Sequence, residues 1–128
     1  MVKVAIIGLD GAPYDFILSI TRKGELGNFR RMIIHGVSGV LRSTIPPVSP
    51  VAWASISTGL NPGKHGIFGF SSRTLRPYCS MNIKGMALWD LLALAHRRCL
   101  CINVPYTYPP YKIRVFLINK YLFLKWYC

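Results

Sequence analysis

The chain has 128 residues, of which 52% are hydrophobic, and this content excludes a wholly disordered protein. Lysine and arginine residues number 16 against 4 aspartate and glutamate residues, which gives a formal net charge of +12. This charge indicates either a partner that bears phosphates, such as nucleic acid or a membrane surface, or a fragment that lacks its acidic portion. The basic residues are scattered and no nucleic-acid-binding motif is visible, so we expect only weak, non-specific binding to nucleic acid.

The first third of the chain is predicted to alternate strands and helices. Residues 4–7 form a short apolar run that precedes Asp10, which indicates a buried strand with an acid at its carboxyl end. Two helices are expected, one from Pro13 to about Lys23 and one from Asn28 to His35. A short strand is then predicted from Val37 to Leu41.

The stretch from Ser43 to Phe70 centres on Ser49 and Pro50. Serine is a preferred helix N-cap and proline suits the first helical position, so Ser49 is expected to cap a helix that Gly59 ends. The positive end of a helix also favours phosphate and other anions. Two interpretations of Ser49 follow: a plain helix cap, or a nucleophile held beside an anion site.

Three more residues of the first half have two interpretations each. His65 either stabilises the turn in Gly-Lys-His-Gly or ligates a metal. Lys64 either faces a phosphate of the substrate or is a solvated lysine. His35 either complements the dipole at the end of its helix or ligates a metal.

The second half is predicted to continue with a loop from Phe68 to Ile83, an amphipathic helix from Met86 to Arg98 and a buried strand from Leu100 to Val104. The helix residues expected to face a sheet are Leu88, Leu91, Leu92 and Ala95. The resulting order β-α-α-β-α-α-β indicates an α/β fold with a mainly parallel sheet flanked by helices.

The four cysteines are Cys79, Cys99, Cys101 and Cys128, and their spacing does not suggest a structural zinc site. A strand would point Cys99 and Cys101 to the same face, where both would act as small hydrophobic residues. We find neither a signal peptide nor a run of roughly 18 apolar residues. We therefore expect a cytoplasmic protein with reduced thiols that does not enter a membrane.

Two segments in order resemble the type I phosphodiesterase/nucleotide pyrophosphatase family of the alkaline phosphatase superfamily. They are G-L-D-G-A at 8–12 and T-I-P-P-V-S-P-V-A-W-A-S-I-S-T-G-L-N-P-G-K-H-G-I-F at 44–68. Residues 89–92 and 102–110 also look like family segments. The resemblance covers about residues 3–111 and implies a partial alkaline-phosphatase-like sandwich.

The resemblance also implies a chemistry. It implies metal-dependent hydrolysis of phosphodiester or nucleotide pyrophosphate bonds, with Ser49 as the nucleophile that attacks phosphorus and forms a covalent intermediate. Asp10 matches the acid that binds one of two divalent metals, usually zinc, and Ser49 would contact the same metal. Many relatives carry an asparagine that helps to bind phosphate where this chain has Ala52, so that contact is not implied here.

The family completes its two metal sites with Asp and His residues further along the chain. We expect this chain to lack them, to hold at most one weakly bound metal, and so to be a truncated, inactive fragment. The alternative is a non-catalytic basic module that binds nucleotide, nucleic acid or anionic lipid. Residues 1–110 would be the N-terminal part of a catalytic domain. Residues 111–128 contain no acid, Gly or Pro, and reflect either a shifted reading frame or an amphipathic tail.

Overall fold

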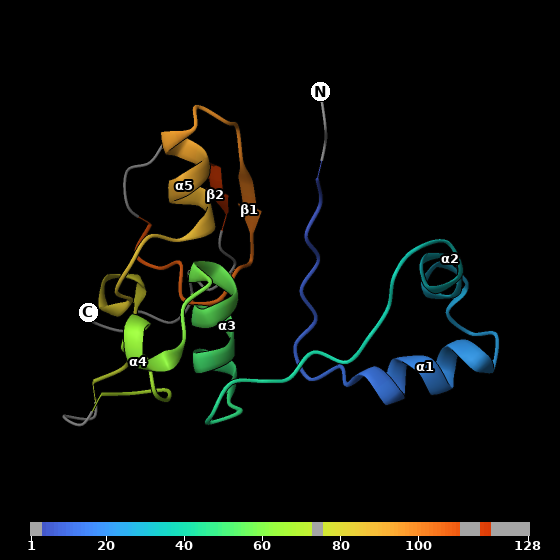
Figure 1. Ribbon diagram of the computed structural model, residues 1–128. Coiled ribbons are helices and arrows are strands. Elements are labelled where there is room, and N and C mark those ends of the chain that lie inside the picture. Colours follow the sequence, from blue (N-terminus) through green and yellow to red (C-terminus); the bar gives the residue numbers. More distant parts are fainter. Residues whose placement is uncertain (1–3, 73–75, 111–115, 119–128) are drawn as a thin grey trace. The chain divides into compact units, whose positions relative to one another are not determined.

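A computed structural model describes residues 4–72, 76–110 and 116–118 of the chain (Figure 1). The chain divides into two compact units, with the boundary between residues 42 and 43. The tail predicted for residues 111–128 therefore lies outside the described residues, except for the three residues 116–118. Among the described residues, no helix has both the length and the apolar character needed to cross a membrane.

The first unit contains helix α1 (Tyr14–Arg22) and helix α2 (Gly27–His35), which contact each other. Both confirm the predicted helices to within one residue at each end. The turn between them passes through Gly24, whose φ of 86° is a backbone conformation that favours glycine. Local periodicity and this glycine thus account for the helical part of the unit.

The two strands predicted in this unit are wrong, because neither residues 4–9 nor residues 37–41 belong to a strand or helix. Their apolar side chains are exposed, with exposed fractions of 81% for Ile7 and 89% for Leu41. A strand forms only where a neighbouring backbone segment pairs with its N–H and C=O groups. No described segment pairs with either run, so apolar composition alone does not make them strands.

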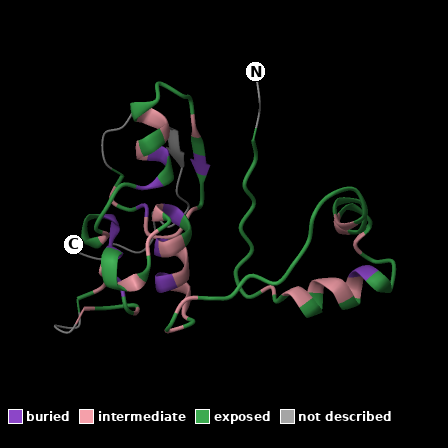
Figure 2. Ribbon diagram, viewed as in Figure 1, coloured by how far each residue is buried: buried purple, intermediate pink, exposed green. Residues whose placement is uncertain are grey.

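The second unit begins with helix α3 (Ser49–Thr58) and helix α4 (Pro62–His65), which pack against each other. Helix α3 carries most of the buried residues of this part, and α4 adds only its last residue (Figure 2). Val51, Ala54 and Ile67 are fully buried there, together with the side chain of His65. The first half of α3 contributes to this small core through Val51 and Ala54.

Strand β1 (Leu100–Ile102) pairs in parallel with strand β2 (Phe116–Ile118), with Leu100 opposite Phe116. The predicted strand from Leu100 is thus confirmed, but it is shorter than expected, and only Cys101 in it is buried. The described residues contain this one pair of short strands and no larger sheet. The mainly parallel sheet flanked by helices that the sequence predicted is therefore not formed within the described part of the chain.

Helix α5 (Leu88–Leu94) is shorter than the helix predicted from Met86 to Arg98. It stops because His96 adopts a φ of 53°, and the Arg97 N–H then donates to the Leu92 carbonyl at 2.8 Å, a common helix ending. The predicted sheet-facing stripe is also wrong, since Leu88 and Leu91 are exposed. Trp89 is buried instead, because its larger apolar surface packs with Ala87 and Cys101.

The described residues 68–72 and 76–83 form a loop as predicted, apart from a bridge between Ser71 and Pro77 and a 3-10 helix, η1 (Ser80–Asn82). Ser80 ties this loop to a distant part of the chain. Its N–H donates to the Tyr108 carbonyl at 2.9 Å, and its hydroxyl donates to the Pro109 carbonyl at 2.7 Å. These two hydrogen bonds join the chain before α5 to the chain after β1.

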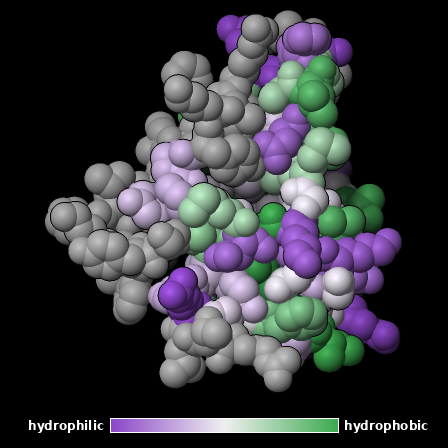
Figure 3. All heavy atoms as spheres, turned by 90° about the vertical axis from the view of Figure 1, so that its left-hand side faces the viewer, coloured by the Kyte–Doolittle hydropathy of each residue, from purple (hydrophilic) through white to green (hydrophobic). Residues whose placement is uncertain are grey.

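The face shown in Figure 3 carries hydrophilic residues across its middle, with hydrophobic residues above and below them.

Candidate active site around Ser49

Ser49 is the first residue of α3, and its side chain is half-buried. The residue that caps the helix is Val48, whose carbonyl accepts hydrogen bonds from the N–H groups of Val51 and Ala52. The prediction that Ser49 is the N-cap is therefore wrong by one position, because the helical hydrogen bonds begin at the carbonyl before it. Ser49 still stands in the first turn, at the positive end of the helix dipole.

The loop before Ser49 is stiffened by local contacts. Pro46 and Pro47 have fixed φ angles, and the Thr44 hydroxyl donates to the Pro46 carbonyl at 3.0 Å. Pro50 and Val51, directly after Ser49, are buried. The serine hydroxyl is thus carried by a backbone that is restrained on both sides.

The far end of α3 is fixed by Gly59 and His65. Gly59 ends the helix with a φ of 69°. The side chain of His65 is fully buried and its Nε2 atom lies 2.9 Å from the hydroxyl of Ser55, in the middle of α3. On its other side, His65 Nδ1 accepts a hydrogen bond from the Ile67 N–H at 3.1 Å.

These contacts decide the protonation of His65. A ring nitrogen that accepts a hydrogen bond carries no proton, so the proton of the neutral ring lies on Nε2 and is donated to Ser55. Burial lowers the pKa of His65 below its ordinary value of 6.5, which also favours the neutral ring. Because Nε2 is a donor here, His65 cannot accept a proton from Ser55, and the pair is a structural contact rather than a serine–base pair.

Of the two interpretations of His65, the structure favours turn stabilisation, since both ring nitrogens are engaged within the protein. The preceding turn is stabilised in the same region. Asn61 caps α4 by accepting a hydrogen bond from the Lys64 N–H at 3.1 Å. Lys64 itself is exposed, and whether its side chain contacts phosphate stays a prediction.

Asp10 lies in the first unit, in an exposed turn where Gly11 has a φ of 66°. Ser49 lies in the second unit, so the two candidate metal ligands belong to different units. Within the described residues, no group of three or more His, Cys, Asp or Glu side chains could hold a metal ion. Asp10 and Ser49 supply oxygen donors that a divalent metal accepts, and two such donors are an incomplete set for catalytic zinc.

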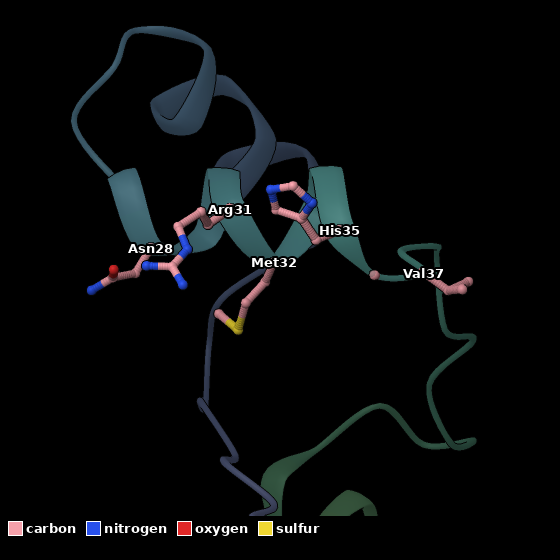
Figure 4. A pocket seen from close by; sticks show the side chains of 6 residues that line it. Asn28, Arg31, Met32, His35 and Val37 are labelled. Atoms are coloured by element: carbon pink, nitrogen blue, oxygen red, sulfur yellow. The ribbon is translucent and has the colours of Figure 1, made fainter.

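A pocket of about 750 Å³ lies beside α2 in the first unit (Figure 4). Arg31 and His35 stand one helical turn apart on its wall. The residues that line it include no carboxylate and no cysteine: Asn28, Arg31, Met32, His35, Gly36 and Val37. No carboxylate or cysteine of this pocket could help His35 to hold a metal ion, so these surroundings favour the dipole interpretation of His35 over metal ligation.

A family model for type I phosphodiesterase / nucleotide pyrophosphatase matches residues 4–126. The chain belongs to this family. Searches of curated proteins and of solved structures found no match. The match to the phosphodiesterase family includes residues 111–126, where the sequence alone showed no family-like segment.

The phosphodiesterase family match places Asp10, Ser49 and His65 within one continuous range and extends through both units. Sequence reasoning missed the contact between Ser55 and His65. Ser55 lies less than one helical turn before the end of α3, and the turn at Gly59 reverses the chain, so the predicted order of helix, turn and second helix could have placed these two residues close together.

Proposed function

We propose that this chain carries the nucleophile of a metal-dependent hydrolase of phosphodiester or nucleotide pyrophosphate bonds, and that Ser49 is that nucleophile. One observation carries the proposal: Ser49 occupies the first turn of α3 inside the range matched by the phosphodiesterase family. Its restrained backbone holds the hydroxyl at a helix end that attracts phosphate. A restrained nucleophile beside an anion site is what attack on a phosphoester requires.

The proposed reaction has two steps. The Ser49 hydroxyl loses its proton to solvent and its oxygen attacks phosphorus, so that a serine–phosphorus ester forms while the bond to the leaving oxygen breaks and that oxygen takes a proton from solvent. Water then hydrolyses this ester, which releases the phosphate product and restores the hydroxyl. Asp10 is proposed to bind a divalent metal, with Ser49 as a second ligand. When bound, such a metal activates the attacking oxygen and stabilises charge on the phosphate oxygens.

For the fold we propose the alkaline-phosphatase-like sandwich with a mainly parallel sheet. The family match supports it, and so does the parallel pairing of β1 with β2. In that fold Asp10 and Ser49 would line one metal position, which requires their oxygens to lie within a few ångströms of each other.

The ligand count limits what this chain is expected to do. Catalytic zinc normally takes three protein ligands and an open position, whereas Asp10 and Ser49 offer two. We therefore expect weak binding of zinc or manganese and no turnover of a nitrophenyl phosphodiester above the level of a Ser49→Ala variant. Clear Ser49-dependent multiple turnover would show that a complete site exists in this chain.

Anion binding tests the proposed role directly. Inorganic vanadate, an analogue of the phosphoryl transition state, is titrated into the full chain with zinc present. We expect Ser49→Ala and Asp10→Asn each to weaken binding about tenfold or more, since a lost contact to a charged group is worth about 1.5–3 kcal/mol.

The matched controls are Ser43→Ala, an exposed serine in the loop before α3, and Asp15→Asn, an exposed acid in α1. Both should bind vanadate as the unchanged chain does, and urea unfolding should show that all four variants fold. Equal vanadate affinity in Ser49→Ala, Asp10→Asn and the unchanged chain would rule out the proposed roles of both residues.

A further inference from the structure

Two cysteines lie side by side at the start of β1. The Sγ atoms of Cys99 and Cys101 are 3.7 Å apart. Cys101 is buried against Trp89 and Ala87, and Cys99 is half-buried beside the same cluster. Leu100, between them, is 58% exposed, so the two thiols share the inner side of the segment as the alternation of a strand requires.

The distance between the sulfur atoms matches that of two ligands on one metal ion. With zinc–sulfur bonds of about 2.3 Å and tetrahedral angles, two coordinating sulfurs lie about 3.8 Å apart. The thiols of Cys99 and Cys101 therefore already stand at chelating distance, and neither needs to change its position by more than a small amount. Thiolates also select soft ions over hard ones such as magnesium.

We propose that Cys99 and Cys101 form a two-thiol binding site for a soft divalent cation of the zinc and cadmium type. Two sulfur–metal bonds form, and the two thiol protons are released to solvent. Burial raises the pKa of the Cys101 thiol to about 12, and the cation offsets this because the ion and two thiolates together carry no net charge. Water completes the coordination on the side where Cys99 reaches the surface.

This site is separate from the proposed active site, because its ligands are the sulfur atoms of Cys99 and Cys101 and not the oxygens of Asp10 and Ser49. Its test therefore uses a property of sulfur ligands. Cadmium bound to thiolates gives a charge-transfer absorption in the ultraviolet, at shorter wavelength than the aromatic bands, which oxygen ligands do not give. The test and the test of the proposed function can fail independently.

The experiment begins with the full chain in which Cys79→Ser and Cys128→Ser leave only the two thiols of interest. Under reducing conditions, cadmium is titrated while the absorption is recorded, and native mass spectrometry gives the stoichiometry. We expect one ion per chain. Cys99→Ser or Cys101→Ser in this background should weaken binding about 100-fold or more, because the second thiolate binds intramolecularly.

Cys101 belongs to the core, so its replacement could unfold the second unit. Cys99→Ser avoids this, since Cys99 is half-buried and Cys101 stays in place. As a second measurement, cadmium should protect both thiols of the two-cysteine chain from alkylation by iodoacetamide. Cadmium affinity unchanged in a folded Cys99→Ser variant, or any stoichiometry other than one ion per chain, would overturn the proposal.

Discussion

Replacement of His65 by alanine is expected to destabilise the second unit more than any exposed substitution in the same helix. His65 is fully buried, and two groups depend on its ring. The Ile67 N–H, also buried, would lose its acceptor at a cost of about 1–3 kcal/mol. The half-buried Ser55 hydroxyl would lose a hydrogen bond worth about 0.5–1.5 kcal/mol. His65→Ala should therefore lower the free energy of unfolding by about 2–4 kcal/mol.

Urea unfolding followed by far-ultraviolet circular dichroism measures this loss. Lys64→Ala, an exposed change in the same short helix, is the matched control and should stay within about 0.5 kcal/mol of the unchanged chain. A double-mutant cycle with Ser55→Ala should give a coupling energy of about 0.5–3 kcal/mol, since the two side chains are in contact. If His65→Ala is as stable as Lys64→Ala, the buried hydrogen bonds of His65 do not hold α3 and α4 together.

Three further predictions concern pH, a glycine and charge. Burial lowers the pKa of His65, so the folded chain binds fewer protons than the unfolded chain below pH 6.5. The contribution of His65 to the free energy of unfolding should therefore be full above pH 6.5 and decrease as the pH falls below it. The difference between the urea midpoints at pH 7.5 and pH 5.5 should be smaller in His65→Ala than in the unchanged chain. Gly85→Ala should lower the free energy of unfolding by about 1–3 kcal/mol, because φ is 91° there and an added Cβ would lie 2.6 Å from the Leu60 side chain. In the same urea assay Gly63→Ala is the control and should leave stability nearly unchanged, because its Cβ would meet only an ordinary contact. Binding to a DNA duplex, measured by fluorescence anisotropy, should be weak, independent of sequence and steeply salt-dependent; tight sequence-selective binding at physiological salt would contradict this.

The parts of the fold that could be predicted are those that local sequence determines. Helices α1 and α2 follow from apolar spacing, and α3 follows from Pro50 near its start and Gly59 at its end. Each of these signals acts within about one helical turn. The start of α3 followed the same rule, since the position of Ser49 in its first turn was predictable and the capping residue was missed by one position.

The parts that could not be predicted depend on distant partners. Residues 4–9 and 37–41 have the composition of strands, but a strand depends on a neighbour that periodicity does not reveal. In α5 the spacing of leucines suggested one face, yet packing buried Trp89 against Cys101, which is twelve residues further along. The buried pair of Ser55 and His65 joins two helices across a turn, so neither helix shows it alone.

The tie between Ser80 and the carbonyls of Tyr108 and Pro109 has a consequence for how the second unit opens. The hydrogen bond between Ser80 and Pro109 joins two residues that are 29 positions apart, so the intervening segment with α5 and β1 is a closed loop. The conformational entropy of this segment rises when the contacts at the ends of the loop break. These two hydrogen bonds oppose this opening, together with the hydrogen bond from the Lys84 N–H to the His65 carbonyl and the pairing of β1 with β2. Such a loop tends to open as one cooperative unit while the rest of the protein stays folded. Exchange of the Ser80 amide proton with solvent deuterium therefore reports the opening of this whole loop, and not just the fraying of η1.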